Sequence, residues 1–111
     1  MFVYILTNPG KTILYVGVTN NLKRRTREHE SNKGNQSTFT GTYYTYKLIY
    51  LEEFRTPRAA IMVEKEIKKV SRKNKLKLIA TKNPKLHFIQ LYLLKHILTS
   101  QLFQTTSKYN P

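Results

Sequence analysis

The chain has no cysteine, no aspartate and no tryptophan among its 111 residues. Without cysteine it can form neither disulfides nor thiolate metal sites. Without aspartate, a two-metal carboxylate cage would have to be built from glutamate alone, and the chain has six acidic residues in all. They are Glu28, Glu30, Glu52, Glu53, Glu64 and Glu66.

A long apolar run free of polar residues is also missing. The most apolar late stretch, residues 86–103, is about as long as a membrane span but contains Gln90, Lys95, His87 and His96. The first ten residues, MFVYILTNPG, lack the basic segment and cleavage pattern of a signal peptide. These absences predict a cytoplasmic protein with no membrane partner. A cytoplasmic location is compatible with association with the nucleoid.

Positive charge, in contrast, is abundant. Twenty Lys and Arg against six Glu give a formal net charge of +14 on 13.1 kDa. Such an excess repels itself in the folded state and indicates a polyanionic partner. Nucleic acid is the leading candidate, and an anionic membrane surface is the alternative. The eight Tyr and five Phe can stack on bases, although such side chains more often fill a core.

Short apolar runs at the start of the chain predict a β-hairpin. Residues 2–7 and 12–17 are rich in β-branched and aromatic side chains, and the Pro-Gly pair between them suits a type II turn. If the turn is centred on that pair, Tyr4 lies directly across from Tyr15. A type II turn is not the favoured two-residue hairpin connection, so a shifted register stays open.

The rest of the chain predicts helices around one further strand, with Thr19 or Asn20 as the cap of the first helix and Thr56-Pro57 as the start of the second. The fold class is therefore α/β (α+β): a small three-stranded, mainly antiparallel sheet flanked by helices in the order β-β-α-β-α-α. The predicted elements after the hairpin are a helix over 21–31, a loop over 32–42, a strand over 43–54, a helix from 57 to about 72, its extension or a new helix over 72–80, a helix over 86–103 and a disordered tail.

The helix over 21–31 carries an arginine and a histidine on its packing side. At about 100° per residue, Leu22, Arg25, Thr26 and His29 share one side, and Leu22 is the only large apolar residue of the helix. An arginine on that side needs a partner, because burial of an unpaired charge is costly. The alternative is an arginine whose stem runs along the edge of the core to solvent.

The helix that starts at Pro57 offers two glutamates. Glu64 and Glu66 lie at opposite margins of its apolar side, so periodicity does not choose between them. Either can instead pair with a nearby lysine of the same helix.

Together these motifs resemble the GIY-YIG nuclease family, in particular its small stand-alone bacterial members. The family's first tripeptide is matched in part by Val3-Tyr4, and the second is YVG at 15–17. Ten residues beyond Tyr15 the family has an arginine, matched by Arg25, and many members carry a histidine four residues later, matched by His29.

The resemblance extends over residues 1–84, the GIY-YIG nuclease-like domain, whereas 85–111, the predicted C-terminal helix and disordered tail, match nothing. Its register selects Glu64 as the metal-binding glutamate. The chain departs from the family at Val63, where an arginine is expected, and it lacks the tryptophan that usually follows Asn-Pro. The further matches are KLIYLEEF at 47–54, AIMVEK at 60–65 and Asn83-Pro84.

The resemblance implies an endonuclease that hydrolyses phosphodiester bonds in DNA with one divalent metal, Mg²⁺ or Mn²⁺. It implies that a tyrosine activates water. Either Tyr4 or Tyr15 can be that base, and the other tyrosine then acts as a positioning residue. Arg25 would hold the scissile phosphate, and His29 would orient a tyrosine or phosphate or relay the proton. The other implied site residues are Glu64 for the metal, Gly17 for a close backbone turn and Asn83 for bracing the metal site.

Exposed basic residues are expected to contact the nucleic-acid backbone with little sequence preference and with affinity that falls steeply with salt. Two alternatives stay open: a nucleic-acid-binding protein on the same scaffold that does not cleave, and a basic structural or interaction protein. The oligomeric state is open, with residues 85–111 as a candidate dimerisation segment. The expected backbone contacts are Lys23, Arg24, Arg27, Lys68, Lys69, Arg72 and Lys73.

Overall fold

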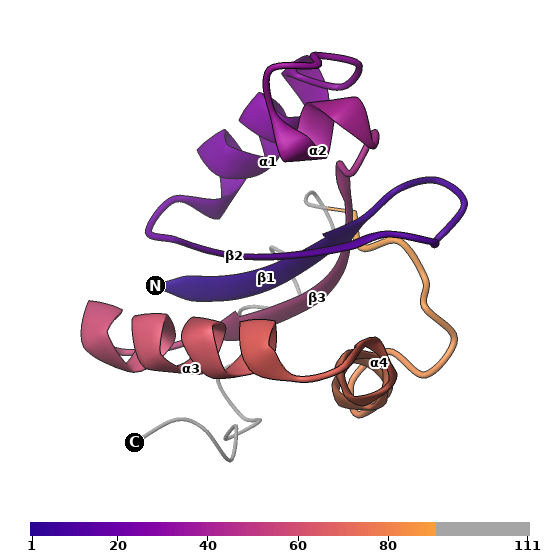
Figure 1. Ribbon diagram of the computed structural model, residues 1–111. Coiled ribbons are helices and arrows are strands. Elements are labelled where there is room, and N and C mark those ends of the chain that lie inside the picture. The colour runs from indigo at the N-terminus through magenta and orange to yellow at the C-terminus, as the bar shows by residue number, and fades with distance from the viewer. Residues whose placement is uncertain (91–111) are drawn as a thin grey trace.

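The computed structural model describes residues 1–90 and confirms the α+β class (Figure 1). The predicted order of elements is confirmed, with one additional short helix before the third strand. The elements are β1 (Phe2–Thr7), β2 (Leu14–Thr19), α1 (Leu22–Ser31), α2 (Phe39–Thr42), β3 (Lys47–Glu53), α3 (Pro57–Lys69) and α4 (Arg72–Ala80).

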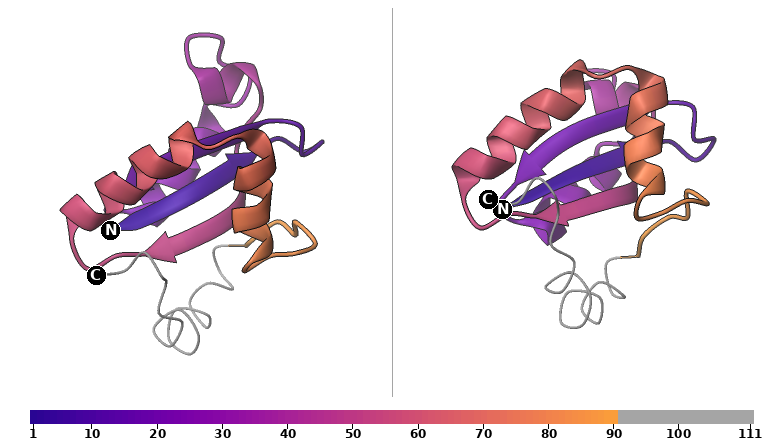
Figure 2. Two further views of the ribbon diagram at one scale, coloured as in Figure 1. Left: turned by 60° about the horizontal axis from the view of Figure 1, so that its bottom comes forward. Right: turned by 90° about the horizontal axis from the view of Figure 1, so that it is seen from below.

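The three strands form one antiparallel sheet in the order β2-β1-β3, so β1 is central and β2 and β3 are edges. Helices α1 and α2 cover one face, and α3 and α4 cover the other (Figure 1). Seen from the α3 side, α4 crosses the strands near one end of the sheet (Figure 2). A sheet covered on both faces explains why β1 is a continuous apolar run rather than an alternating one.

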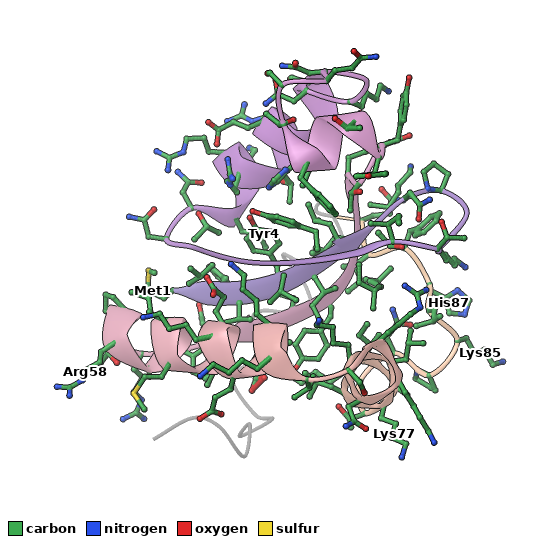
Figure 3. All side chains as sticks on the ribbon, in the orientation of Figure 1. Met1, Tyr4, Arg58, Lys77, Lys85 and His87 are labelled. Atoms are coloured by element: carbon green, nitrogen blue, oxygen red, sulfur yellow. The ribbon has the colours of Figure 1, made fainter. Side chains whose placement is uncertain are left out.

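Successive side chains of β1 point to opposite faces and enter two separate cores. Val3 and Ile5 pack in the core under α3 and α4, together with Ile67 and Ile79. On the other face, Tyr4 and Leu6 pack with Leu22 of α1, Leu48 and Leu51. Tyr4 is thus a member of the smaller core, between the sheet and α1 (Figure 3).

The register of the hairpin differs from the expected one. Tyr4 pairs with Gly17, and Tyr15 pairs with Leu6, so the register is the shifted one that the sequence left open and not the direct pairing of Tyr4 with Tyr15. The connection is longer than a two-residue turn, because the Asn8 side chain accepts hydrogen bonds from the backbone N–H groups of the residues at 12 and 13. The second strand consequently starts two residues later than predicted.

The helix ends follow capping chemistry. The cap of α1 is Asn21, whose side chain accepts from the N–H of Arg24, so the prediction of Thr19 or Asn20 as the cap is wrong. Thr56 caps α3 with Pro57 in its first turn, as predicted. Ser71 caps α4, which is therefore a new helix and not an extension of α3.

The predicted loop over 32–42 contains the helix α2, so that part of the prediction is wrong. Thr38 caps this helix by accepting from the N–H of Gly41. The chain then turns back through Tyr43 and Tyr44, and β3 begins only at Lys47, four residues later than predicted. No helix within residues 1–90 is long and apolar enough to cross a membrane.

The predicted helix over 86–103 is not present in its described part, residues 86–90. There the backbone N–H of Ile89 donates to the carbonyl oxygen of Leu48 at 2.7 Å, which lays this segment against the free edge of β3. The remainder of that prediction, together with the predicted disordered tail, lies outside the described residues.

Candidate active site

The Tyr4 side chain lies across Gly17 on the edge strand β2. A Cβ atom on Gly17 would overlap the Cζ atom and the hydroxyl of Tyr4 and lie 2.9 Å from its Cε2. Only glycine leaves room for the phenol to cross the neighbouring strand at this height. The sequence-based role of Gly17 was to let the backbone turn; in the structure it makes space for Tyr4.

Helix α1 supplies two side chains that converge on the Tyr4 hydroxyl. Arg25 donates from Nε to the hydroxyl at 3.3 Å, and His29 Nε2 lies 3.1 Å from the same oxygen. The other ring nitrogen of His29, Nδ1, lies 3.1 Å from Oγ1 of Thr40 in α2. One phenol thereby links the central strand to α1 and, through the imidazole, to α2.

The exposure of these groups decreases inward from the arginine. The Arg25 side chain is 37% exposed, and its Nη1 also lies 3.6 Å from Glu28. Tyr4 and His29 are 1% and 3% exposed. The Nε atom of Arg25 therefore contacts the phenol, while the outer side of its guanidinium is open to solvent. The sequence left open whether this arginine has a buried partner or extends to solvent, and in the structure it does both.

Burial raises the pKa of the Tyr4 phenol above its usual 10.0. The hydrogen bond and the charge of Arg25 lower this pKa, whereas the charges of Tyr15 and Glu64 raise it further, and the net shift is upward. Burial, followed by the charge of Arg25, lowers the pKa of His29 from 6.5 to about 4, against a smaller opposite effect of Glu28. At neutral pH the phenol thus keeps its proton and the imidazole is neutral.

The shifted pKa of His29 predicts a stability that falls in mild acid. Between pH 6.5 and about 4 the unfolded chain binds a proton on His29 that the folded protein does not. Stability therefore rises with pH across this window, and the contribution of His29 is lost as the pH falls through it. From about pH 7 to about pH 5 the expected loss is about 2 kcal/mol.

The measurement is the free energy of urea-induced unfolding at the two pH values, for the natural protein and for His29→Gln, whose side chain does not titrate. The glutamates contribute equally to both proteins, so the difference between the two pH slopes isolates the histidine. Equal slopes would contradict the prediction.

Tyr15 completes the aromatic part of the cluster from β2. Its ring centroid lies 6.4 Å from that of Tyr4 and 5.5 Å from that of His29. It is only half-buried, whereas Tyr4 is fully buried. Arg25 interacts electrostatically with both phenols. The two tyrosines are therefore neighbours although they are not cross-strand partners.

Glu64 lies on α3, which packs on the opposite face of the sheet against β1 and β2. Its side chain is 13% exposed and its Oε1 lies 3.3 Å from Nζ of Lys68. Its charge is the smallest of the effects that raise the pKa of Tyr4, which lies on the other face of the sheet. Glu66, the alternative that periodicity left open, is exposed.

The donor set limits which metal could bind. Within residues 1–90 there is no group of three or more His, Cys, Asp or Glu side chains placed to hold an ion. Mg²⁺ in nucleotide and nucleic-acid enzymes keeps several waters and takes one or two carboxylates besides substrate phosphates. A single carboxylate fits this ion when water and substrate phosphates supply the other ligands. The exposed Lys68 partner is a weak competitor, because exposed ion pairs contribute little.

The seven basic residues expected to contact phosphates are all exposed, but they fall into two groups on opposite faces of the sheet. One group is on α1, and the other is on α3 and α4. Arg72 also has a structural role, since it donates from Nη1 to the carbonyl oxygen of Thr12 at 2.7 Å and so ties α4 to the hairpin turn. The α1 group comprises Lys23, Arg24 and Arg27; the other comprises Lys68, Lys69, Arg72 and Lys73.

Asn83 makes its hydrogen bonds to β3 and to the segment that follows α4. Its Nδ2 donates to the carbonyl oxygens of Ile49 at 2.9 Å and of His87 at 2.8 Å, and its Oδ1 accepts from the N–H of His87. Ile49 belongs to β3, the edge opposite to β2. These hydrogen bonds fasten the segment after α4 to the sheet, so the contacts of Asn83 do not support the bracing role that the sequence suggested.

Thr40 is a site residue that the sequence did not indicate. It is buried and meets the ring of His29, but it lies in a polar segment predicted to be loop. The available signal was the cap residue Thr38, which begins α2. Gly41, the third residue of this helix, favoured a loop, and so the helix was missed.

Comparison with known proteins identifies the family. The model of the GIY-YIG catalytic domain matches residues 1–77, which include the two tyrosines, Arg25, His29 and Glu64. No solved structure matches the chain significantly.

Several relatives align over most of their own length. The UPF0213 protein of Natronomonas pharaonis is 38% identical over 79 residues, covering 71% of this chain and 89% of that relative. The one of Clostridium perfringens is 40% identical over 84 residues, covering 76% and 87%. The one of Bacillus licheniformis is 42% identical over 69 residues, covering 62% and 69%. This chain belongs to the GIY-YIG nuclease family and is similar to its UPF0213 proteins.

Proposed function

We propose that the protein is a metal-dependent endonuclease that hydrolyses phosphodiester bonds in DNA. The observation that carries the proposal is the convergence on one phenol: Arg25 and His29 contact the Tyr4 hydroxyl, with Tyr15 beside them and Glu64 within electrostatic reach. A binding surface alone would not need a nearly buried carboxylate in such a cluster.

Arg25 is the proposed phosphate-binding residue. Its Nε is held by Tyr4, and the exposed side of its guanidinium can offer two parallel donors to the oxygens of the scissile phosphate. Tyr4, buried and protonated, then acts as a positioning residue that fixes the guanidinium. His29 holds Tyr4 in turn, and the hydrogen bond to Thr40 fixes the plane of its ring.

Tyr15 is the proposed base. As the phenolate, its oxygen would take a proton from the water whose oxygen forms the new bond to phosphorus, while the bond from phosphorus to the leaving oxygen breaks and that oxygen departs with the electron pair. A phenolate is an anion, so this role is favoured by a positive charge beside it, and Arg25 interacts electrostatically with Tyr15. Burial makes Tyr4 less suited to this step, because it raises the pKa of that phenol.

Glu64 is the proposed metal-binding residue, with Mg²⁺ or Mn²⁺ as the ion. A divalent cation bound there would stabilise the negative charge that develops on the leaving oxygen. The high positive charge of the chain supplies the general attraction to the nucleic acid.

The test is cleavage of supercoiled plasmid and of labelled duplex, branched and single-stranded DNA, with Mg²⁺ and with EDTA. We expect nicking that requires the metal. Contaminating nucleases also require Mg²⁺, so the Arg25→Lys variant is purified in parallel as a control. Lysine keeps the charge but loses the paired donors, so cleavage by this variant should fall by about 10²-fold or more.

Nicking that is unchanged in Arg25→Lys would contradict the proposal. Folded protein that binds DNA but cleaves none of the substrates with Mg²⁺ or Mn²⁺ would favour the non-cleaving binder. Protein that neither binds nor cleaves would favour the structural or interaction protein.

A further inference from the structure

Two exposed aromatic side chains lie at the ends of the short helix α2, where Phe39 is its first residue and Tyr43 directly follows its last. Phe39 and Tyr43 are 52% and 47% exposed. Exposed aromatic side chains that lie together mark a site of interaction, because a core is where such residues are usually placed. The proposed chemistry uses neither residue.

These two rings continue the row of aromatic side chains that begins inside the candidate active site. Starting from His29, the next ring is Tyr15, with centroids 5.5 Å apart. The Phe39 ring is 6.3 Å from that of Tyr15 at an interplanar angle of 29°, and the Tyr43 ring is 4.8 Å from that of Phe39. The row therefore leads from the proposed base to the surface.

The backbone that carries the row is held in place by hydrogen bonds. The N–H of Thr45 donates to the carbonyl oxygen of Thr40 at 2.7 Å, and the N–H of Gly34 donates to that of Gly41 at 2.8 Å. A Cβ on Gly41 would overlap the carbonyl oxygens of Asn32 and Asn35, so α2 is packed tightly on the turn after α1. The rings are thus presented by a fixed element.

The row of aromatic rings suits a flat, apolar ligand, and the arginine beside it suits an anionic one. Arg25, next to Tyr15, is the proposed phosphate-binding residue, and the chain has a net charge of +14. A second copy of this chain would carry the same charge and be repelled. A nucleobase attached to the bound backbone meets both requirements, since bases stack on exposed aromatic rings with little sequence preference.

We propose that Phe39 and Tyr43 form a stacking platform for an unpaired nucleobase of the strand bound at the candidate active site. The bases of a duplex are already stacked on both sides, so a platform of this kind favours single-stranded segments, whether free or at a junction or end. The proposal rests on the proposed function for the position of the strand, but it concerns binding and can be measured without cleavage.

The test is fluorescence anisotropy in EDTA with three labelled probes: a short oligothymidylate, an oligomer of the same length made only of abasic sites, and a duplex. The natural protein should bind the oligothymidylate about tenfold more tightly than the abasic oligomer, which has the same phosphates without bases. Phe39→Ala should lose about tenfold for the oligothymidylate and little for the other two probes. Phe39→Trp should bind the oligothymidylate as the natural protein does.

Tyr44→Asn is the matched control. Tyr44 is also exposed, at 52%, and follows Tyr43 directly, but its hydroxyl lies near Gly34, outside the row of rings. Asparagine tolerates the left-handed backbone of this position, where φ is 54°. This variant should bind all three probes as the natural protein does.

Equal affinity of the natural protein for the oligothymidylate and the abasic oligomer would overturn the proposal. So would a loss in Phe39→Ala that is the same for all probes, or a dimer that dissociates in Phe39→Ala, which would make the row a self-association surface. Base-dependent binding in a protein that does not cleave would keep the platform and overturn the proposed function. Cleavage without base-dependent binding would keep the proposed function and overturn the platform.

Discussion

Replacing Glu64 with glutamine is expected to reduce Mg²⁺-dependent cleavage by at least about 10³-fold while DNA binding, measured in EDTA, stays close to that of the natural protein. Glutamine has nearly the same shape but no charge, and Glu64 is the carboxylate that lies within electrostatic reach of Tyr4. The side chain is only 13% exposed, and its ion pair is with an exposed lysine, so the fold should tolerate the change.

Glu66→Gln is the matched control, since the same substitution is made two residues away on the same helix at an exposed position. Its cleavage rate should equal that of the natural protein. The two rates are compared over a range of Mg²⁺ concentrations. If Glu66→Gln lost cleavage and Glu64→Gln kept it, the assignment of the metal-binding glutamate would be wrong.

Gly17→Ala is expected to lose both stability and cleavage. The added methyl group overlaps the end of the Tyr4 ring, which is buried between the sheet and α1 and cannot move aside freely. Overpacking of this kind costs about 1–3 kcal/mol. Any shift of the ring that relieves the overlap also moves the hydroxyl from Arg25 and His29, so the cleavage rate should fall even in the molecules that remain folded.

A double-mutant cycle with Tyr4→Leu separates the two effects. Leucine lacks the ring atoms that the methyl group would meet, so Gly17→Ala should cost much less stability in the Tyr4→Leu background than in the natural protein. Cleavage should be low in both Tyr4→Leu proteins because the phenol is gone. Additive costs in urea unfolding would show that the glycine is needed for another reason.

The chain itself carries strong local signals. The apolar run over Phe2–Thr7 predicted a strand covered on both faces, and the Thr56-Pro57 pair predicted the start of α3. In α1, the side that contains Leu22, Thr26 and His29 was recognised from the helical period and is the buried side. These features depend on neighbours within a few residues, which is why the sequence determines them.

The failures came where an individual contact, and not a repeating pattern, decides the outcome. The hairpin register depends on how Asn8 closes the connection, and the Pro-Gly pair alone pointed to a shorter turn. Helix α2 was missed because its glycine favoured a loop, whereas tight packing on the turn after α1 makes that glycine necessary. The bracing role of Asn83 at the metal site stays a prediction; its hydrogen bonds are to Ile49 of β3 and to His87.

The sequence by itself determined the fold class, the helical side on which Arg25 and His29 lie and the large positive charge, since composition and local period encode them. Only the tertiary structure decided that Tyr4 crosses Gly17 to meet both residues and that Thr40 holds the imidazole. Such contacts join segments far apart in the chain. They depend on register and packing, which no local pattern specifies.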